Sequence, residues 1–375
     1  MPLGVVPAVV VFDFDPVGVI LGFAVRWQYV AVALVIFATL LLAGAIAVVA
    51  ERRRVGRLMR DPERVGAAAE AARAAEETVR ANAAAAGDRP AAPADAPSQV
   101  EAPAPAPAPG SSEDRPWPVG LRADDLLFIV AGGIAGAVVG GRIGWVLLYL
   151  DYYRDHQGAI LDPAVGGLTL AGGIVGGVLA GIAMAAVLGA PVSRWLGVAI
   201  VPLLLGLGLG KLAMVLGGAG QGLPIDATWA TAYAGPGPWA SLAPLIPSHP
   251  SQVYEALTSA GALLVVLLLT LVPAFRRRPA ALFATGIGLW AAGRFAVAFT
   301  WRDPPLVGDL NGDQLVTIGI VVVAAIGLVA IAVRAWGRRR APSAGGSPAS
   351  GVPASPAASS AATSGTGGGE PAAEG

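Results

Sequence analysis

Residues 27–50 read WQYVAVALVIFATLLLAGAIAVVA, a run of 24 residues without a single Asp, Glu, Lys or Arg. Over the whole chain of 375 residues, 55% are hydrophobic and only 13% are charged, and the mean hydropathy is +0.66. A helix needs about 20 apolar residues to cross the hydrocarbon core of a bilayer. Several runs approach that length, so the sequence predicts an all-α, polytopic membrane protein with about seven transmembrane helices. The predicted spans are residues 27–50, 125–149, 166–188, 195–216, 252–274, 280–301 and 314–336.

Basic residues gather on every second connection between these spans. They occur in ERRRVGRLMRDPER (51–64), in RRR (276–278) and in RAWGRRR (334–340), whereas the opposite connections carry aspartates and few arginines. Cytoplasmic loops of membrane proteins are enriched in Lys and Arg. We therefore predict that the N-terminus lies outside and the C-terminus lies in the cytoplasm, which an odd number of spans also requires.

Composition divides the chain into four parts. Residues 1–50 hold the N-terminal segment and the first transmembrane helix. Residues 51–118 form a cytoplasmic insertion that is first basic and then rich in Ala and Pro, a composition typical of disorder. Residues 119–340 form a six-helix transmembrane core that carries the site. Residues 341–375 form an Ala/Pro/Ser/Gly tail, which we predict to be disordered and cytoplasmic.

Three spans carry a cation next to glycine: Arg142 in VVGGRIGWVL, Lys211 in LGLGKLAMVL and Arg294 in WAAGRFAVAF. A cation in hydrocarbon is costly, so it indicates a functional site. All three lie roughly 8–12 Å below the predicted outer surface, at 1.5 Å per helical residue, and Glu255 is predicted at the same depth. The pattern predicts a pocket for an anionic group near the outer leaflet. Two simpler interpretations remain open: the cations snorkel to the interface, or Glu255 forms a structural ion pair with one of them.

The rest of the composition excludes several kinds of chemistry. The chain has no cysteine and only two histidines. We therefore expect no disulfide, no thiol nucleophile, no metal site and no cofactor. The formal net charge is zero and no basic patch alternates with aromatic residues, so we expect no nucleic-acid partner.

The connection 217–250 leads into SHPSQVYEAL (248–257), where a helix is predicted to begin. Pro250 and Ser251 suit the first turn of a helix. If the helix starts there, Ser251, Tyr254 and Glu255 share one face at i, i+3 and i+4 spacing.

Three further interpretations concern the predicted outer boundary. Asn311 and Asp313, in NGDQ (311–314), are predicted to cap the last helix. Trp301 is predicted to anchor the helix at the membrane interface. Arg302 and Asp303 are predicted to form an exposed pair.

The segment HPSQVYE resembles the HPxQxYE motif of bacterial prolipoprotein diacylglyceryl transferases. The resemblance covers all seven spans and excludes residues 65–118 and 341–375. Further segments resemble family motifs in the same order: FAVRWQY (23–29), GGRIGWVLLY (140–149), VGGLTLAGG (165–173), GLGLGKLAMVLGGAGQG (206–222) and AAGRFAVAFTWRDP (291–304).

The resemblance implies an enzyme of lipoprotein maturation. Members transfer the diacylglyceryl group of phosphatidylglycerol to the lipobox cysteine of a preprolipoprotein and release glycerol phosphate. The expected partners are phosphatidylglycerol, the lipobox peptide and membrane lipid. The expected location is the bacterial plasma membrane, as a multi-pass protein with its site near the outer leaflet. The absence of cysteine is no obstacle, because the thiol belongs to the substrate.

Residue roles are carried over from the matching motifs. Arg142 and Arg294 match family arginines and are expected to hold the phosphodiester and stabilise the leaving phosphate. His249 and Glu255 are the candidates for activating the thiol. The expected substrate contacts are Lys211, Gly141, Gln252, Tyr254, Gln28 and Gly172.

The chain also departs from the family pattern. Ala171 stands where the family has a functional histidine, and Lys211, the only lysine of the chain, replaces an arginine. Lysine keeps the charge but lacks the bidentate fork that suits a phosphate. Other family polar positions are occupied by Met214, Gly217, Ala219, Gln28 and Ala298.

Three functions therefore remain open. We favour an active, divergent transferase in which His249 or Glu255 activates the thiol. The alternative is a catalytically inactive paralogue that binds an anionic phospholipid or a lipoprotein precursor. A membrane anion transporter is the third, suggested by the recurrence of glycine next to a cation in three spans.

Overall fold

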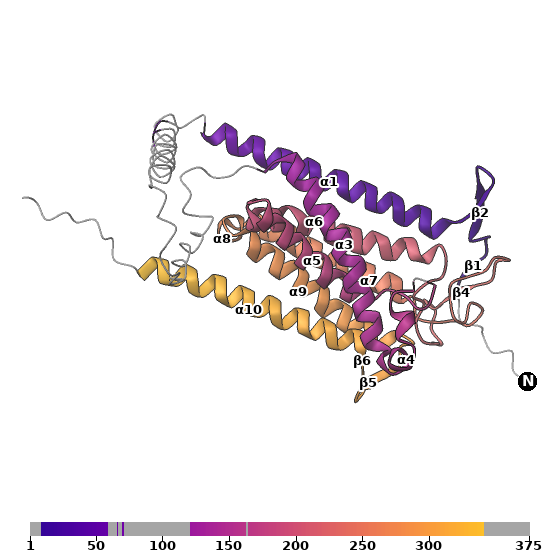
Figure 1. Ribbon diagram of the computed structural model, residues 1–375. Helices are drawn as coiled ribbons and strands as arrows, with labels where there is room; N and C mark the ends of the chain where they lie inside the picture. The colour runs from indigo at the N-terminus through magenta and orange to yellow at the C-terminus, as the bar shows by residue number, and fades with distance from the viewer. Residues whose placement is uncertain (1–8, 59–65, 67–69, 71–120, 163, 341–375) are drawn as a thin grey trace, which may run out of the picture. The chain divides into compact units, whose positions relative to one another are not determined.

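In a computed structural model, the described residues are 9–58, 66, 70, 121–162 and 164–340. Seven long apolar helices confirm the predicted all-α polytopic membrane fold (Figure 1). Their contacts form one compact unit over residues 1–332; the second unit, 333–375, contains the end of the last helix. The helices are α1 (Trp27–Leu58), α3 (Ala123–Leu148), α5 (Leu170–Val187), α6 (Val192–Val215), α7 (Ser251–Leu269), α9 (Pro279–Val297) and α10 (Gly312–Arg340).

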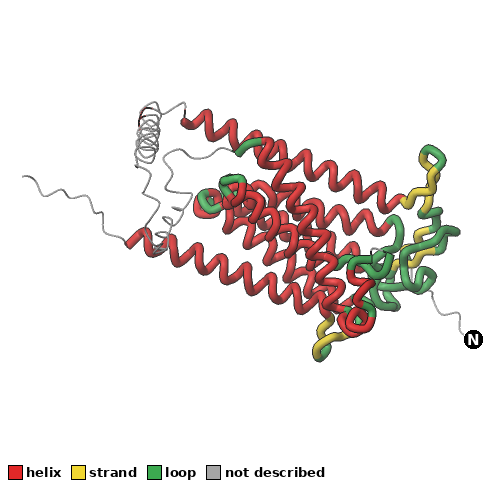
Figure 2. Tube along the Cα trace, viewed as in Figure 1, coloured by secondary structure: helices red, strands yellow, loops and turns green. Residues whose placement is uncertain are grey.

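Short elements connect these helices, and the strands gather with the longer loops at one end of them (Figure 2). Strand β1 pairs with β4 in parallel, so the segment before the first span is bound to the 217–250 connection. Strand β2 pairs with β3, and β5 with β6, both antiparallel. The strands are β1 (Val10–Phe12), β2 (Val17–Ile20), β3 (Phe23–Arg26), β4 (Thr231–Tyr233), β5 (Pro305–Val307) and β6 (Leu310–Asn311). The short helices are α4 (Leu150–Asp155), η1 (Gln157–Ile160), α8 (Pro273–Arg276) and η2 (Ala298–Thr300).

Helices α3 and α5 touch backbone to backbone through glycines. A Cβ atom added to Gly140 would lie 2.5 Å from the carbonyl oxygen of Gly172, and one added to Gly172 would lie 2.5 Å from that of Gly140. Gly136 and Gly176 oppose each other in the same way one turn further along. Small residues at such an interface let two membrane helices approach closely. Any larger side chain at these four positions would force the two helices apart.

A second core joins α6, α7, α9 and α10. Its buried members include Ile200 and Leu204 of α6, Val266 of α7, and Ile287 and Trp290 of α9. Apolar residues of α10 pack against the same cluster. This packing fixes the ends of these four helices relative to one another. Those ends carry four charged residues of the predicted outer layer and its neighbourhood: Lys211, Glu255, Arg294 and Asp313.

Several helix boundaries differ from the prediction by three residues or more, among them the end of α1, the start of α5 and the end of α7. Helix α1 continues past residue 50 to Leu58, through the basic segment. Helix α5 begins at Leu170 rather than 166, because Gly166 has a φ of +90° that a right-handed helix does not allow. Helix α7 ends at Leu269 rather than 274, and Pro273 opens α8 instead. Most of the predicted insertion 51–118 and all of the predicted tail 341–375 lie outside the described residues.

Candidate functional site

Arg294, near the end of α9, is the centre of a buried group of charges. Its side chain is only 6% exposed. Nε donates to Asp313 Oδ2 at 2.8 Å and Nη2 donates to Asp313 Oδ1 at 3.1 Å, which is a bidentate pair. Nη1 forms an ion pair with Glu255 Oε2. The guanidinium is therefore held in one orientation by two carboxylates from two other helices.

Glu255, in the second turn of α7, connects this arginine to Lys211. Its Oε1 lies 2.6 Å from Lys211 Nζ, while its Oε2 pairs with Arg294, so both carboxylate oxygens are occupied. Together, α6, α7, α9 and α10 contribute one charged side chain each. We call Lys211, Glu255, Arg294 and Asp313 the charge cluster. Its two cations and two carboxylates balance, which is why the charges can be buried.

Two tryptophans pack on the charge cluster. The ring centroid of Trp301 lies 4.4 Å from Arg294 Cζ and 5.8 Å from Lys211 Nζ. The ring of Trp290 lies 5.8 Å from Arg294 Cζ. Aromatic faces attract cations at these distances. The turn after α9 thus folds the Trp301 indole over the two cations, which the sequence did not indicate. Its role as an interfacial anchor stays a prediction.

Arg142 lies in a different environment. None of its contacts joins it to Lys211 or Arg294, so of the three predicted cations the structure brings two together. All five of its N–H donors point to backbone carbonyls of the 156–167 connection, and its Cζ lies 5.5 Å from the ring of Tyr153. Its phosphate-binding role stays a prediction. The acceptors are the carbonyl oxygens of Ala159 (2.7 Å), Ile160 (2.7 Å), Asp162 (2.9 Å), Val165 (2.9 Å) and Gly167 (3.4 Å).

The sequence HPSQVYE places His249 just before α7, which begins at Ser251 as predicted. His249 Nδ1 lies 3.4 Å from the hydroxyl oxygen of Tyr254, and Trp229 Nε1 donates to the same oxygen at 3.0 Å. Burial lowers the pKa of the His249 imidazole below its ordinary value. The ring is consequently neutral at pH 7 and able to accept a proton.

Two buried glutamines offer unpaired acceptors near the connection 217–250. Gln28 is 5% exposed and Gln252 is 1% exposed, and the Oε1 atom of each has no hydrogen-bond partner among the described residues. Gln252 Nε2 donates to the hydroxyl of Tyr233 at 3.4 Å, and Gln28 lies against Gly217. Burial raises the pKa of Tyr233 to about 12, so its phenol stays protonated. Substrate contact by Gln28 and Gln252 stays a prediction.

The two glycines predicted to contact substrate serve helix packing in this structure. The carbonyl oxygen of Gly141 accepts the Thr169 N–H at 3.0 Å, and Gly172 packs against Gly140. Ala171, at the position of the family histidine, is 1% exposed. Substrate contact by Gly141 and Gly172 stays a prediction.

The prediction that Asp313 caps the last helix is wrong. Asn311 and Gln314 form the cap: the N–H of Gln314 donates to Asn311 Oδ1 and the N–H of Asn311 donates to Gln314 Oε1, both at 2.9 Å. This reciprocal pairing has the form of a capping box. Asp313 is thereby free to pair with Arg294. Nothing in the sequence signals that pair, because its members lie 19 residues apart in different helices.

The predicted exposed pair of Arg302 and Asp303 is also wrong. Arg302 Nε donates to the carbonyl of Gly222 at 2.7 Å and its Nη2 donates to Ser248 Oγ at 2.9 Å. The arginine thus binds the end of α9 to the connection before α7. Asp303 lies at the edge of the charge cluster, where partial desolvation and the Asp313 charge raise the pKa of its carboxyl, opposed by Arg294.

Comparison with known proteins identifies relatives over most of the chain. A family model described as prolipoprotein diacylglyceryl transferase matches residues 112–330, which include the whole charge cluster. A phosphatidylglycerol–prolipoprotein diacylglyceryl transferase of Nitrobacter hamburgensis is 34% identical over 237 residues, 61% of this chain and 77% of that protein. Proteins of the same name from Geobacter sulfurreducens (32% over 206 residues, 52% of this chain and 74% of the relative) and Rhodopseudomonas palustris (30% over 250 residues, 64% and 81%) also match.

Proposed function

Because the chain belongs to the prolipoprotein diacylglyceryl transferase family, we propose that it transfers the diacylglyceryl group of phosphatidylglycerol to the cysteine of a prolipoprotein. The charge cluster supports this most directly. Four spans contribute one charged residue each to the cluster, and its two cations are held by carboxylates and contact the ring of Trp301. The distribution of basic residues between the connections supports a location of the charge cluster just below the outer surface of the plasma membrane. A lipid substrate of the outer leaflet would meet the charge cluster there.

The reaction requires a site for a phosphate that gains charge. The thiolate sulfur attacks the glycerol carbon that bears the phosphate; the carbon–sulfur bond forms and the carbon–oxygen bond breaks. The bonding electron pair leaves with the oxygen, and glycerol phosphate is released. Positive groups that are already oriented stabilise such a leaving group without rearrangement.

Lys211 and Arg294 meet that requirement while they remain in ion pairs with Glu255 and Asp313. Arg294 uses three of its five N–H donors for carboxylates, and Lys211 Nζ uses one of its three. The remaining donors can bind phosphate oxygens. Glu255 and Asp313 act as positioning residues, because every one of their contacts with the cations restricts how those cations can turn.

Replacing Lys211 tests whether its charge serves the phosphate. We expect Lys211→Met to reduce transfer by about 10²-fold, by removal of one positive group from the leaving phosphate. Lys211→Arg keeps the charge and adds a fork, so its transfer should equal or exceed that of the wild type. Initial rates with phosphatidylglycerol vesicles and a lipobox peptide measure both. Equal rates for the two variants would remove Lys211 from the phosphate site.

The thiol proton needs an acceptor, and we propose that His249 takes it. Both oxygens of Glu255 are engaged in ion pairs, whereas His249 is neutral at pH 7. Since its pKa is lowered, the acid limb of the pH profile should have its midpoint below the ordinary histidine value of about 6.5. His249→Gln should reduce the rate by about 10²–10⁴-fold and abolish this acid limb. A pH profile from about pH 5 to pH 8 measures both; an unchanged limb in the variant would assign the proton to another group.

Mass spectrometry of the peptide product tests the function itself. Purified protein, phosphatidylglycerol and a lipobox peptide should give a diacylglyceryl mass increase on cysteine, and a Cys→Ser peptide should not. The alternative is an inactive, lipid-binding paralogue, which is favoured by the buried Ala171 at the family's histidine position. The absence of product next to an active relative would support that alternative.

A further inference from the structure

The hairpin formed by β2 and β3 has an exposed apolar tip. Residues 16–25, which contain most of this hairpin, read PVGVILGFAV and include no charged or hydrogen-bonding side chain. Leu21 in the turn is 93% exposed, and Val19 and Phe23 on either side of it are 75% and 73% exposed. Contiguous apolar surface of this kind marks a site of contact with another protein or with a membrane.

The turn at the tip holds its leucine in an unfavourable backbone conformation. Leu21 and Gly22 form a two-residue turn with φ of +52° and +85°. Asn and Gly are the usual residues of such a turn, and a leucine is strained there. Of the non-glycine residues that the structure describes, Leu21 alone has a positive φ. Because this side chain is almost fully exposed, contacts within the protein do not offset the strain, whereas an apolar environment around the tip would.

The base of the hairpin is fixed at the end of α1. No residue separates β3 from α1. The N–H of Trp27 donates to the carbonyl of Pro16 at 3.0 Å, and the Trp27 ring packs against Gly18. The next residue, Gln28, lies against Gly217, just beyond the end of α6. The hairpin therefore leaves the helices at the level where two neighbouring spans end, on the side of the charge cluster.

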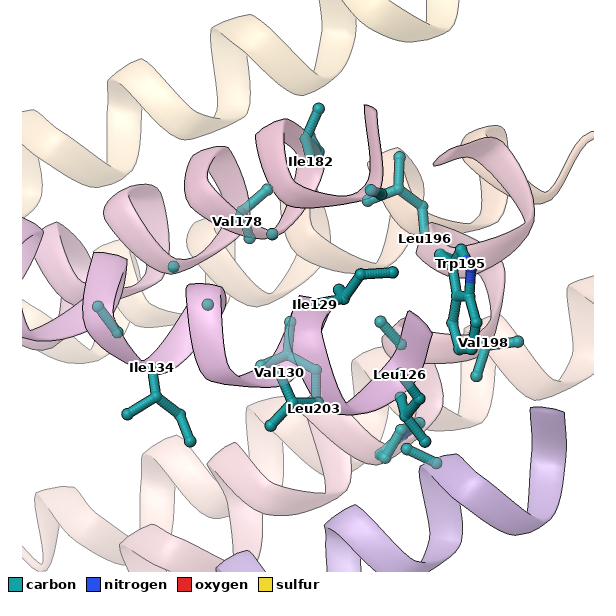
Figure 3. A pocket seen from close by; sticks show the side chains of 18 of the residues that line it. Leu126, Ile129, Val130, Ile134, Val178, Ile182, Trp195, Leu196, Val198 and Leu203 are labelled. Atoms are coloured by element: carbon teal, nitrogen blue, oxygen red, sulfur yellow. The ribbon is translucent and has the colours of Figure 1, made fainter. Parts of the chain in front are cut away.

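From this base the hairpin extends sideways, away from the other helices (Figures 1 and 2). Next to it, α1 presents apolar side chains to its surroundings: Leu34 and Phe37 are more than half exposed within an apolar span of 30 residues. None of the described residues that line the groove between α1, α3, α5 and α6 is charged, and Ile129 and Val130 project around it (Figure 3). A span with such a surface lies in hydrocarbon, so the hairpin extends over the lipid beside α1.

The apolar side chains project from both faces of the hairpin. Val19 pairs with Ala24 and Ile20 pairs with Phe23, so Val19 and Phe23 lie on opposite faces. Both are largely exposed. A docked polypeptide would cover one face and leave the other in water, whereas fluid lipid can contact both faces and the turn between them. The pattern therefore favours lipid as the partner.

We propose that the β2–β3 hairpin is a membrane anchor whose tip enters the leaflet at the charge-cluster end of the helices. No third strand pairs with the outer edges of β2 and β3. Hydrocarbon excludes such backbone edges, so the backbone stays among the headgroups while the side chains of Val19, Leu21 and Phe23 reach the acyl chains. The tip carries no charge and needs no anionic headgroup. The proposal does not depend on transfer activity.

Spin labels test the depth of the tip, because the chain contains no cysteine and each label needs only one substitution. Leu21→Cys and Phe23→Cys place a label at the tip. Leu34→Cys, at an exposed position of α1, is the control in lipid, and Asp13→Cys, at an exposed aspartate before the hairpin, is the control in water. Full-length protein is placed in phosphatidylcholine vesicles. Electron paramagnetic resonance then measures collisions of each label with oxygen, which concentrates in lipid, and with a water-soluble nickel complex on both sides of the vesicles.

We expect the ratio of nickel to oxygen collisions at both tip labels to lie at least about tenfold below the ratio at Asp13→Cys, because hydrocarbon excludes polar solutes. Adding Phe23→Asp should return the Leu21→Cys label to water, and the matched change Phe23→Trp should leave it in lipid. Tip ratios equal to that of Asp13→Cys would overturn the proposal. Protection that appears only after a lipobox peptide is added would also overturn it, by assigning the hairpin to peptide docking.

Discussion

Replacing Arg294 with glutamine is expected to reduce diacylglyceryl transfer by about 10²–10³-fold, the effect of removing one oriented donor from a site of developing charge. The same change leaves Asp313 buried without its cation and leaves Glu255 paired with Lys211 alone. Removing one partner of a buried ion pair costs about 3–5 kcal/mol of folding free energy. The variant should therefore be both inactive and less stable.

A double variant separates these two effects. In Arg294→Gln/Asp313→Asn the unpaired carboxylate is neutralised while the Lys211–Glu255 pair stays intact. Thermal unfolding in detergent should return most of the way to that of the wild type, but transfer should remain low. Recovery of transfer along with stability would mean that Arg294 serves only the fold. Full loss of stability in both variants would contradict the charge-balance argument.

Replacing Arg142 with alanine is expected to destabilise the protein by about 3–5 kcal/mol, because five carbonyl oxygens lose a charged donor at once. These carbonyls belong to residues 159–167, in the connection between α4 and α5. Carbonyls at both ends of this segment accept hydrogen bonds from the one guanidinium, which therefore holds the segment together. Arg142→Lys should lie between the wild type and Arg142→Ala, since lysine has at most three donors.

The control for this prediction is Arg154→Ala. Arg154 forms an exposed pair with Asp151, and such surface pairs contribute about 0–1 kcal/mol. Unfolding temperature and the rate of proteolysis within residues 156–167 measure the structural effect, and transfer is assayed in parallel. Loss of transfer without loss of stability in Arg142→Ala would instead support direct contact with the phosphate, as the family resemblance implies.

The membrane fold could be predicted from the sequence because it depends on local composition. An apolar run such as residues 27–50 must satisfy its backbone hydrogen bonds internally, and in hydrocarbon only a helix or a closed barrel does so. The start of α7 at Ser251 followed equally from local residues, since Pro250 and Ser251 suit a first turn. Helix boundaries were predicted less well where the backbone leaves helical geometry, as at Gly166 before α5.

The charge cluster could be predicted only in part. A cation within a span is conspicuous in any sequence, and Lys211, Glu255 and Arg294 were all selected for that reason. Asp313 and Trp301 were assigned to a cap and to the interface, because each stands beside a helix end where those roles are common. Only the packing of α9 against α10 and the turn after α9 bring these two side chains to Arg294.

The sequence by itself thus determined that this protein is helical, spans a membrane seven times and carries costly buried cations, because hydrophobic transfer and helix formation act over neighbouring residues. Tertiary structure decided what each cation does. Arg142 and Arg294 look alike in sequence, each following glycine near the end of a span. Arg142 meets backbone carbonyls and stabilises a connection, whereas Arg294 meets carboxylates of two other helices and joins Lys211 in one cluster. A guanidinium takes its role from the acceptors within a few ångströms of it, and those acceptors come from distant parts of the chain.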